Sequence, residues 1–243
     1  IMSSVALGTI ITMTSSHWLL AWIGLELNTL AIVPIIAKQH HPRATEATTK
    51  YFLTQAAASA LVLFASTTNA WSTGTWDISQ LTDRHACALL TAALAMKLGL
   101  APLHFWLPEV LQGTSTKTAL IIATWQKLAP AALLYMVHSS IIPTILLTMA
   151  VFSTMTGGWG GLNQTQTRKI MAFSSIAHLG WMASILTLNP NIMLLNLLLY
   201  MIMTAPMFLM LMFSSAKTVK DLTTSWTISP PTTALMLLLL MSM

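Results

Sequence analysis

The stretch KLGLAPLHFWLPEVLQG, residues 97–113, lies near the end of an apolar run that begins around His85. It places Lys97 deep within a hydrophobic segment. Helix breakers follow at Gly99, Pro102 and Pro108. Because proline lacks a backbone N–H and clashes with the preceding turn, the stretch predicts a discontinuous helix near residues 99–108. In a bilayer, broken backbone is tolerated only where protein or a water-filled cavity satisfies it. A buried lysine beside such a break indicates a functional site, and the structural alternative is a lysine that extends to the membrane surface.

The composition is that of a polytopic membrane protein. Hydrophobic residues make up 55% of the chain and charged residues 7%, with a mean hydropathy of +0.72. Soluble domains carry roughly 25% charged residues. The net charge of +5 comes from basic residues scattered between apolar runs, a pattern that does not favour nucleic-acid binding. With Cys87 as its single cysteine, the chain can form neither an internal disulfide nor a cysteine-based metal cluster.

The apolar runs predict an all-α transmembrane helix bundle without a soluble domain. The expected helices cover residues 1–13, 17–37, 51–71, 85–107, 118–137, 141–159, 170–188 and 192–213, and a ninth begins at 231. A spanning helix needs about 20 residues, so the first run is too short to cross. We therefore expect a fragment of a longer protein, truncated at both ends. Pro130, one turn after Lys127, predicts a bend in the fifth helix as well.

Basic residues are distributed unequally between the predicted loops. If each span crosses once, one set of loops carries eight Lys or Arg residues, and the opposite set carries Arg84 together with Asp77 and Asp83. The eight are Lys38, Arg43, Lys50, Lys117, Arg168, Lys169, Lys217 and Lys220. The positive-inside rule predicts that these eight share one face of the membrane.

Three ionisable side chains are expected near the middle of the bilayer. Glu26, Lys97 and Lys127 lie about 15–18 Å from the ends of their predicted spans, in a core about 30 Å thick. Each charge at that depth costs roughly 2.5–3.5 kcal/mol. A structural Glu–Lys pair would explain one lysine and leave the other unexplained. The set therefore favours proton or ion handling.

Two histidines are weaker candidates for proton transfer. His104 lies within the predicted break, and His178 lies in the middle of a helix, in AFSSIAHLGWM. Either could relay a proton or be a hydrogen-bonded structural residue. The pair His40–His41 does not match metal-ligand spacing, and GGWGGLNQ lacks the strand context of a dinucleotide motif. We expect no cofactor, metal or redox catalysis in this chain.

Several segments together resemble the antiporter-like membrane subunits of mitochondrial respiratory complex I. They are HWLLAWIGLELNTLAI, HHPRATEATTKYFLTQAAASALVLF, LGLAPLHFWLPEVLQG and GGWGGLNQTQTRKIMAFSSIAHLGWM. The resemblance runs through most of the chain and implies two inverted repeats, the first covering about 1–138 and a partial second about 141–243. It also implies proton movement across the inner membrane, coupled to quinone reduction elsewhere in the complex. NAD, FMN, iron–sulfur clusters and ubiquinone would be held by partner subunits.

The family's proton-transfer residues can be placed on matching motifs. Its glutamate in WxGLExN matches Glu26, its broken-helix lysine in MKLGLAPLHFW matches Lys97, and its central lysine in WQKLAP matches Lys127. Its histidine in SSIxHLGW matches His178. The resemblance implies that Glu26 pairs with Lys97, that the basic loops face the matrix, and that other complex I membrane subunits and the lipid bilayer are the partners. A free-standing cation/proton antiporter is the alternative, and it would be active without partners.

Overall fold

The computed structural model describes residues 2–38, 41–226 and 230–242, and the regular elements in these ranges are helices. Six helices are long and apolar enough to cross a membrane. They are Trp18–Ala37, Pro42–Thr73, Thr116–Met136, Pro143–Leu162, Thr167–Leu186 and Pro190–Ser214. The predicted all-α, multi-pass membrane fold is therefore confirmed.

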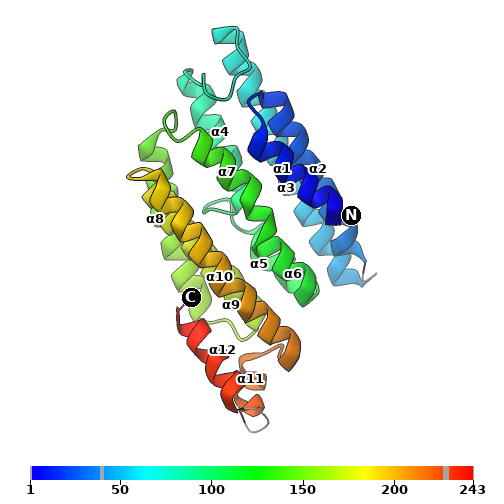
Figure 1. Ribbon diagram of the computed structural model, residues 1–243. Coiled ribbons are helices and arrows are strands. Elements are labelled where there is room, and N and C mark those ends of the chain that lie inside the picture. The colour runs from blue at the N-terminus through cyan, green and yellow to red at the C-terminus, as the bar shows by residue number, and fades with distance from the viewer. Residues whose placement is uncertain (1, 39–40, 227–229, 243) are drawn as a thin grey trace.

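The helices form two outer groups with two segmented helices between them (Figure 1). One outer group holds α1 (Met2–Thr14), α2 (Trp18–Ala37) and α3 (Pro42–Thr73). The other holds α8 (Pro143–Leu162), α9 (Thr167–Leu186) and α10 (Pro190–Ser214). Between them lie α4 (Arg84–Leu98), α5 (Trp106–Gly113), α6 (Thr116–Ala123), the 3-10 turn η1 (Trp125–Lys127) and α7 (Leu128–Met136). Two further helices, α11 (Val219–Ser225) and α12 (Pro230–Ser242), follow α10.

The predicted break in the fourth helix is confirmed and is confined to residues 99–105. Helix α4 ends at Gly99, which adopts the left-handed φ of 87° and donates its N–H to Ala95. Glycine reaches that conformation without a Cβ clash, so it ends the helix at little cost. Pro108 does not break the chain, because it lies in the first turn of α5, where its missing N–H has no intrahelical partner.

The bend predicted in the fifth helix is a second break. Helix α6 ends at Ala123, a short 3-10 turn follows, and α7 begins at Leu128. Pro130 cannot donate to the carbonyl of Gln126, and its ring clashes with that carbonyl. The amide of Lys127 bonds to Thr124 at 3.3 Å instead of to Ala123, so the carbonyl of Ala123 is released from the helix ladder.

The start of α3 corrects the sequence prediction by nine residues, from 51 to Pro42. The side chain of His41 caps the helix by accepting from the amide of Arg43 at 3.2 Å, and Pro42 fits the first helical position. Lys50 adds an ion pair to Glu46 at 2.6 Å, one turn away. Arg43 and Lys50 therefore lie on the helix and not in a loop. With 32 residues, α3 is about 48 Å long and exceeds the thickness of the hydrocarbon core.

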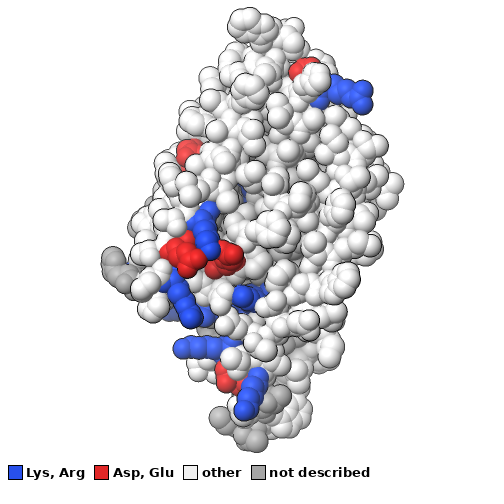
Figure 2. Space-filling model, turned by 180° about the vertical axis from the view of Figure 1, so that it is seen from behind, with Lys and Arg blue, Asp and Glu red and all other residues white. Residues whose placement is uncertain are grey.

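The surface separates apolar flanks from a charged end. Large apolar side chains are exposed on the outer sides of the bundle, including Leu20, Val151 and Leu198. In Figure 2, Lys and Arg side chains gather toward the lower end of the molecule, with few near the upper end. This distribution fits a chain whose flanks face lipid and whose ends face water.

Candidate functional site

Lys97 and Lys127 lie at the two breaks and are almost completely buried. Lys97 is in the last turn of α4 and is 5% exposed, and Lys127 ends the turn η1 and is 2% exposed. Glu26 is half-buried in the middle of α2, and its Oε2 atom is shielded from solvent. The structure thus places the three predicted side chains on three different elements inside the bundle.

Glu26 and Lys97 interact electrostatically without a direct ion pair. Lys97 lies within the electrostatic reach of the Glu26 carboxyl, and no such interaction reaches Lys127 among the described residues. Lys50 forms ion pairs with Glu46 and Glu109, whereas no ion pair within 4.0 Å joins Glu26 to Lys97. Lys97 Nζ and Glu26 Oε2 each lack a hydrogen-bond partner there. Burial of two such groups without partners is costly, which makes them candidates for a functional role.

Lys127 has a defined partner, Tyr200 on α10. Lys127 Nζ donates to Tyr200 Oη at 3.0 Å and lies 4.5 Å from the centre of the ring. Tyr200 Oη in turn donates to the carbonyl of Ala123 at 3.0 Å, the acceptor released by the second break. The ring of His178 lies against that of Tyr200, with centroids 5.6 Å apart. Lys127, Tyr200 and His178 thus form one contiguous cluster.

Gln126, next to Lys127, ties the break to α2 and α3. Its Nε2 donates to Asn28 Oδ1 at 2.9 Å, and its Oε1 accepts from Tyr51 Oη at 3.3 Å. Asn28 lies two residues after Glu26, and Tyr51 is within the electrostatic reach of Glu26. This polar chain therefore connects the surroundings of Glu26 with the turn that carries Lys127.

Sequence reasoning missed Asn28, Tyr51 and Tyr200. Buried side chains of these types are common in helix bundles, and their partners lie 98, 75 and 73 positions away in the chain. A sign was available for Tyr200, because a polar ring in the middle of the apolar run of α10 needs a partner when it is buried.

His104 is separate from the cluster. It is 8% exposed, and its ring lies against that of Phe105 with a centroid distance of 4.4 Å and an interplanar angle of 31°. In the described part of the chain, its Nδ1 has no hydrogen-bond partner, and no ion pair or ring contact joins it to Glu26 or either lysine. The structure therefore gives His104 a place within the break and no direct link to the charged residues.

Protein groups satisfy the backbone at the first break. The amide of Ala101 donates to Ser153 Oγ on α8 at 2.9 Å, and Trp106 Nε1 donates to the carbonyl of Met96 at 3.0 Å. The break is thus braced by α8 and by its own aromatic residue, which meets the requirement for non-helical backbone in a membrane.

The two broken helices with buried lysines define a membrane subunit of the antiporter-like class. The family model described as "NADH:quinone oxidoreductase/Mrp antiporter, TM" matches residues 15–243. The chain belongs to this family and, within it, to the NADH-ubiquinone oxidoreductase chain 2 proteins. It is 59% identical over 243 residues to that protein from Xenopus laevis and 60% identical to that from Salmo salar. In both comparisons the match covers 100% of this chain and 70% of the relative.

Solved structures share the fold. A chain of respiratory complex I from Thermus thermophilus with bound aureothin matches with a TM-score of 0.80 and 33% identity, over 86% of this chain and 49% of that one. A chain of the Mrp complex from Dietzia matches with a TM-score of 0.80 and 20% identity, over 86% of this chain and 43% of that chain. This chain therefore spans about half the length of these solved chains. The Mrp likeness shows the fold alone.

Proposed function

We propose that the chain is a proton-translocating membrane subunit of NADH:ubiquinone oxidoreductase, with Glu26, Lys97 and Lys127 as its proton-transfer residues. The observation that carries the proposal is the placement of two buried lysines at two helix breaks, with Glu26 near one of them but not in contact. The relatives at 59% and 60% identity carry the name of that enzyme's chain 2, which favours it over a free-standing cation/proton antiporter.

The break at Gly99 supports the protonated form of Lys97. It creates the C-terminal end of a helix inside the membrane, where the aligned backbone dipoles place partial negative charge. That end favours a cation, whereas burial opposes one. The proton affinity of Lys97 is therefore set by opposing effects, and a modest shift of the Glu26 carboxylate changes their balance.

Movement of Glu26 is proposed to load and unload the lysine. When the carboxylate approaches, the ammonium form of Lys97 is stabilised, and when it moves away, the proton is released to the next acceptor. Moving one charge against the membrane potential requires roughly 2.3 kcal/mol per 100 mV. A change of two units in lysine pKa corresponds to about 2.7 kcal/mol, which is sufficient.

Lys127 is proposed as the next station. Its neutral amine can accept a proton, and Tyr200 Oη stabilises the resulting ammonium by accepting its hydrogen bond. His178, against the Tyr200 ring, is placed to exchange a proton with this cluster. We retain His104 as a candidate of lower rank, because its ring contact is with Phe105.

The setting of the subunit follows from its family. We propose that it lies in the mitochondrial inner membrane beside other antiporter-like subunits, with its basic loops facing the matrix. NAD, FMN, iron–sulfur clusters and ubiquinone are assigned to partner subunits. We further propose that the elements up to residue 138 form one repeat and that those from 141 onward begin its inverted counterpart.

Replacement of Lys97 tests the proposal in the intact assembly. Lys97→Met keeps the length and apolarity of the side chain, so we expect the complex to assemble and its proton uptake per NADH oxidised to fall. Lys117→Met, which removes an exposed lysine in the first turn of α6, is the matched control and should leave uptake unchanged. Full assembly with normal uptake in Lys97→Met would show that the lysine is structural. Loss of assembly would support a charge pair that holds helices together.

A further inference from the structure

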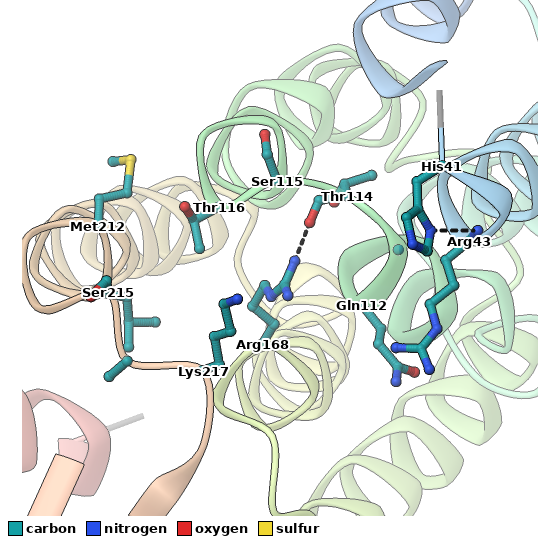
Figure 3. A pocket seen from close by; sticks show the side chains of 13 residues that line it. His41, Arg43, Gln112, Thr114, Ser115, Thr116, Arg168, Met212, Ser215 and Lys217 are labelled. Carbon is teal, nitrogen blue, oxygen red and sulfur yellow. Dashed lines mark hydrogen bonds between the residues drawn. The ribbon is translucent and has the colours of Figure 1, made fainter. Parts of the chain in front are cut away.

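A cavity of about 480 Å³ opens at the charged end of the molecule, away from the buried lysines. It lies where the start of α3, the turn between α5 and α6, the start of α9 and the end of α10 meet (Figure 3). Its basic lining residues are His41, Arg43, Arg168 and Lys217. The lining contains no Asp or Glu. The cavity therefore gathers basic side chains from three separate parts of the chain, at the starts of α3 and α9 and after the end of α10.

Hydrogen bonds position the guanidinium of Arg168 and the main chain of Lys217 at the centre of the cavity. The guanidinium of Arg168 donates to the carbonyl of Thr114, which orients it into the cavity. Lys217 lies next to the antiparallel bridge between Gln166 and Thr218, in which Thr167 N donates to Lys217 O at 3.2 Å and Val219 N donates to Thr165 O at 3.0 Å. Figure 3 shows the Lys217 side chain alongside that of Arg168. An anion between these two cationic groups would be attracted to both of them.

Asp221, on the adjacent α11, interacts electrostatically with Lys217 but does not line the cavity. Asp221 Oδ2 accepts from the amides of Lys217 and Thr218 at 3.0 and 2.8 Å, and so caps α11. Glu109, on the neighbouring α5, is bonded to Lys50. Both acids are therefore engaged outside the lining of the cavity.

Other lining groups suit a phosphate with an attached apolar portion. The hydroxyl groups of Thr116 and Ser215 can donate to anionic oxygens, whereas those of Thr114 and Ser115 bond to Leu111 and Thr118. Leu211 and Met212, from the last turn of the membrane-spanning α10, form an apolar wall. Ser215, at the rim, is a non-glycine residue with the left-handed φ of 49°, a strained conformation that often occurs at ligand sites.

We propose that this cavity binds a phosphate group, held by Arg168 and Lys217 with His41 and Arg43 at the margin. Arginine matches phosphate oxygens with paired N–H donors, and basic pockets between helices at the membrane surface bind anionic headgroups. The phosphate can belong to an anionic phospholipid or be free inorganic phosphate. The site is independent of the proposed proton pathway, because it shares no residue with that pathway.

Photo-crosslinking in the intact purified assembly tests this site. Photoreactive phosphatidylglycerol is compared with photoreactive phosphatidylcholine, and the labelled peptide that contains residues 211–217 is quantified by mass spectrometry. We expect stronger labelling by the anionic lipid, and a loss of about fivefold for each cation removed in Arg168→Gln and Lys217→Gln. Lys117 is an exposed lysine outside the lining, so Lys117→Gln is the control and should not change labelling.

Excess inorganic phosphate separates the two sources. Labelling that persists identifies a lipid-borne phosphate, and labelling that is displaced identifies a site for free phosphate. Equal labelling by the two lipids, or unchanged labelling in both variants, would overturn the proposal. Lys217 is exposed, so Lys217→Gln keeps the test decisive if Arg168→Gln fails to assemble.

Discussion

Lys127 and Tyr200 stand 73 positions apart in the chain and are joined at 3.0 Å, from Nζ to Oη, between a break in one helix and the middle of another. The same hydroxyl donates to the carbonyl of Ala123, which the break has released from the helix ladder. The break thus provides both the position of the lysine and the acceptor that fixes its partner. Removing this hydroxyl should therefore affect the lysine and the broken helix together.

Tyr200→Phe keeps the ring and removes the hydroxyl. Lys127 Nζ then loses its acceptor and Ala123 its donor, so we expect a loss of about 1–3 kcal/mol in stability and a fall in proton uptake per NADH. Tyr135→Phe makes the same change at an exposed hydrogen bond to Asn191 and should be nearly silent. Both are measured as assembly level, thermal stability and proton uptake of the complex. Normal uptake in Tyr200→Phe would remove Tyr200 from the pathway.

Gln126→Leu breaks the polar chain between α2, α3 and η1. It leaves Asn28 and Tyr51 without the partners that Gln126 supplies, and each unsatisfied buried group costs about 1–3 kcal/mol. We expect lower thermal stability of the complex together with lower proton uptake. Gln164→Leu is the matched control, because the Gln164 side chain donates to the carbonyl of Gly160, four residues earlier at the end of α8, and links no distant helices. Equal effects of the two substitutions would contradict a role for Gln126 in linking the helices.

Much of the fold could be predicted from the sequence, because its signals are local. Apolar runs set the spans, and the breaks follow from Gly99 and Pro102 in one helix and from Pro130 in the other. The start of α3 could not be read in this way, because its first two turns are polar. Their helical form depends on the His41 cap and the Glu46–Lys50 pair, which hydropathy does not detect.

The charged residues of the candidate site could be predicted from the sequence, but the residues that contact them could not. Glu26, Lys97 and Lys127 stand out because a charge in an apolar run is costly. Tyr200, Asn28 and Tyr51 carry no such signal, since their importance arises from tertiary contacts. Conversely, His104 stands out in the sequence, yet the described contacts do not connect it to the charged residues.

Ser153→Ala tests how the first break is supported. The substitution removes the acceptor of the Ala101 amide, and a buried unpaired N–H costs about 1–3 kcal/mol. We expect lower thermal stability of the complex and faster amide exchange over residues 99–105. Ser184→Ala removes a hydroxyl that bonds within its own helix at an exposed position, and should leave both measurements unchanged. Unchanged exchange in Ser153→Ala would mean that α8 does not brace the break.

The stability of the α11 N-terminal cap should depend on pH, because the cap includes the carboxyl group of Asp221. Hydrogen bonds from Thr218, followed by that from Lys217, hold the pKa of the Asp221 carboxyl below its ordinary value of 3.8. The stabilisation is therefore complete above that value and is lost as the pH falls through the lowered pKa. Limited proteolysis measures this effect. At neutral pH we expect the Asp221→Ala variant to be cleaved around residues 214–219 faster than the parent protein. The ratio of the two rates should approach one in strong acid, and a ratio of one at neutral pH would contradict the cap's role.

The orientation of the chain can be tested at the two ends of α3. Thr45 lies in its first turn, and Ser79 lies in the segment that follows its far end, and both side chains are exposed. A helix of about 48 Å places these positions on opposite sides of a core about 30 Å thick. We expect a membrane-impermeant thiol reagent to label Thr45→Cys only from the matrix side and Ser79→Cys only from the other side. The native Cys87 is buried and serves as the internal control for unwanted access. Labelling of both positions from one side would contradict the crossing of α3, and a reversed pattern would contradict the proposed matrix location of the basic end.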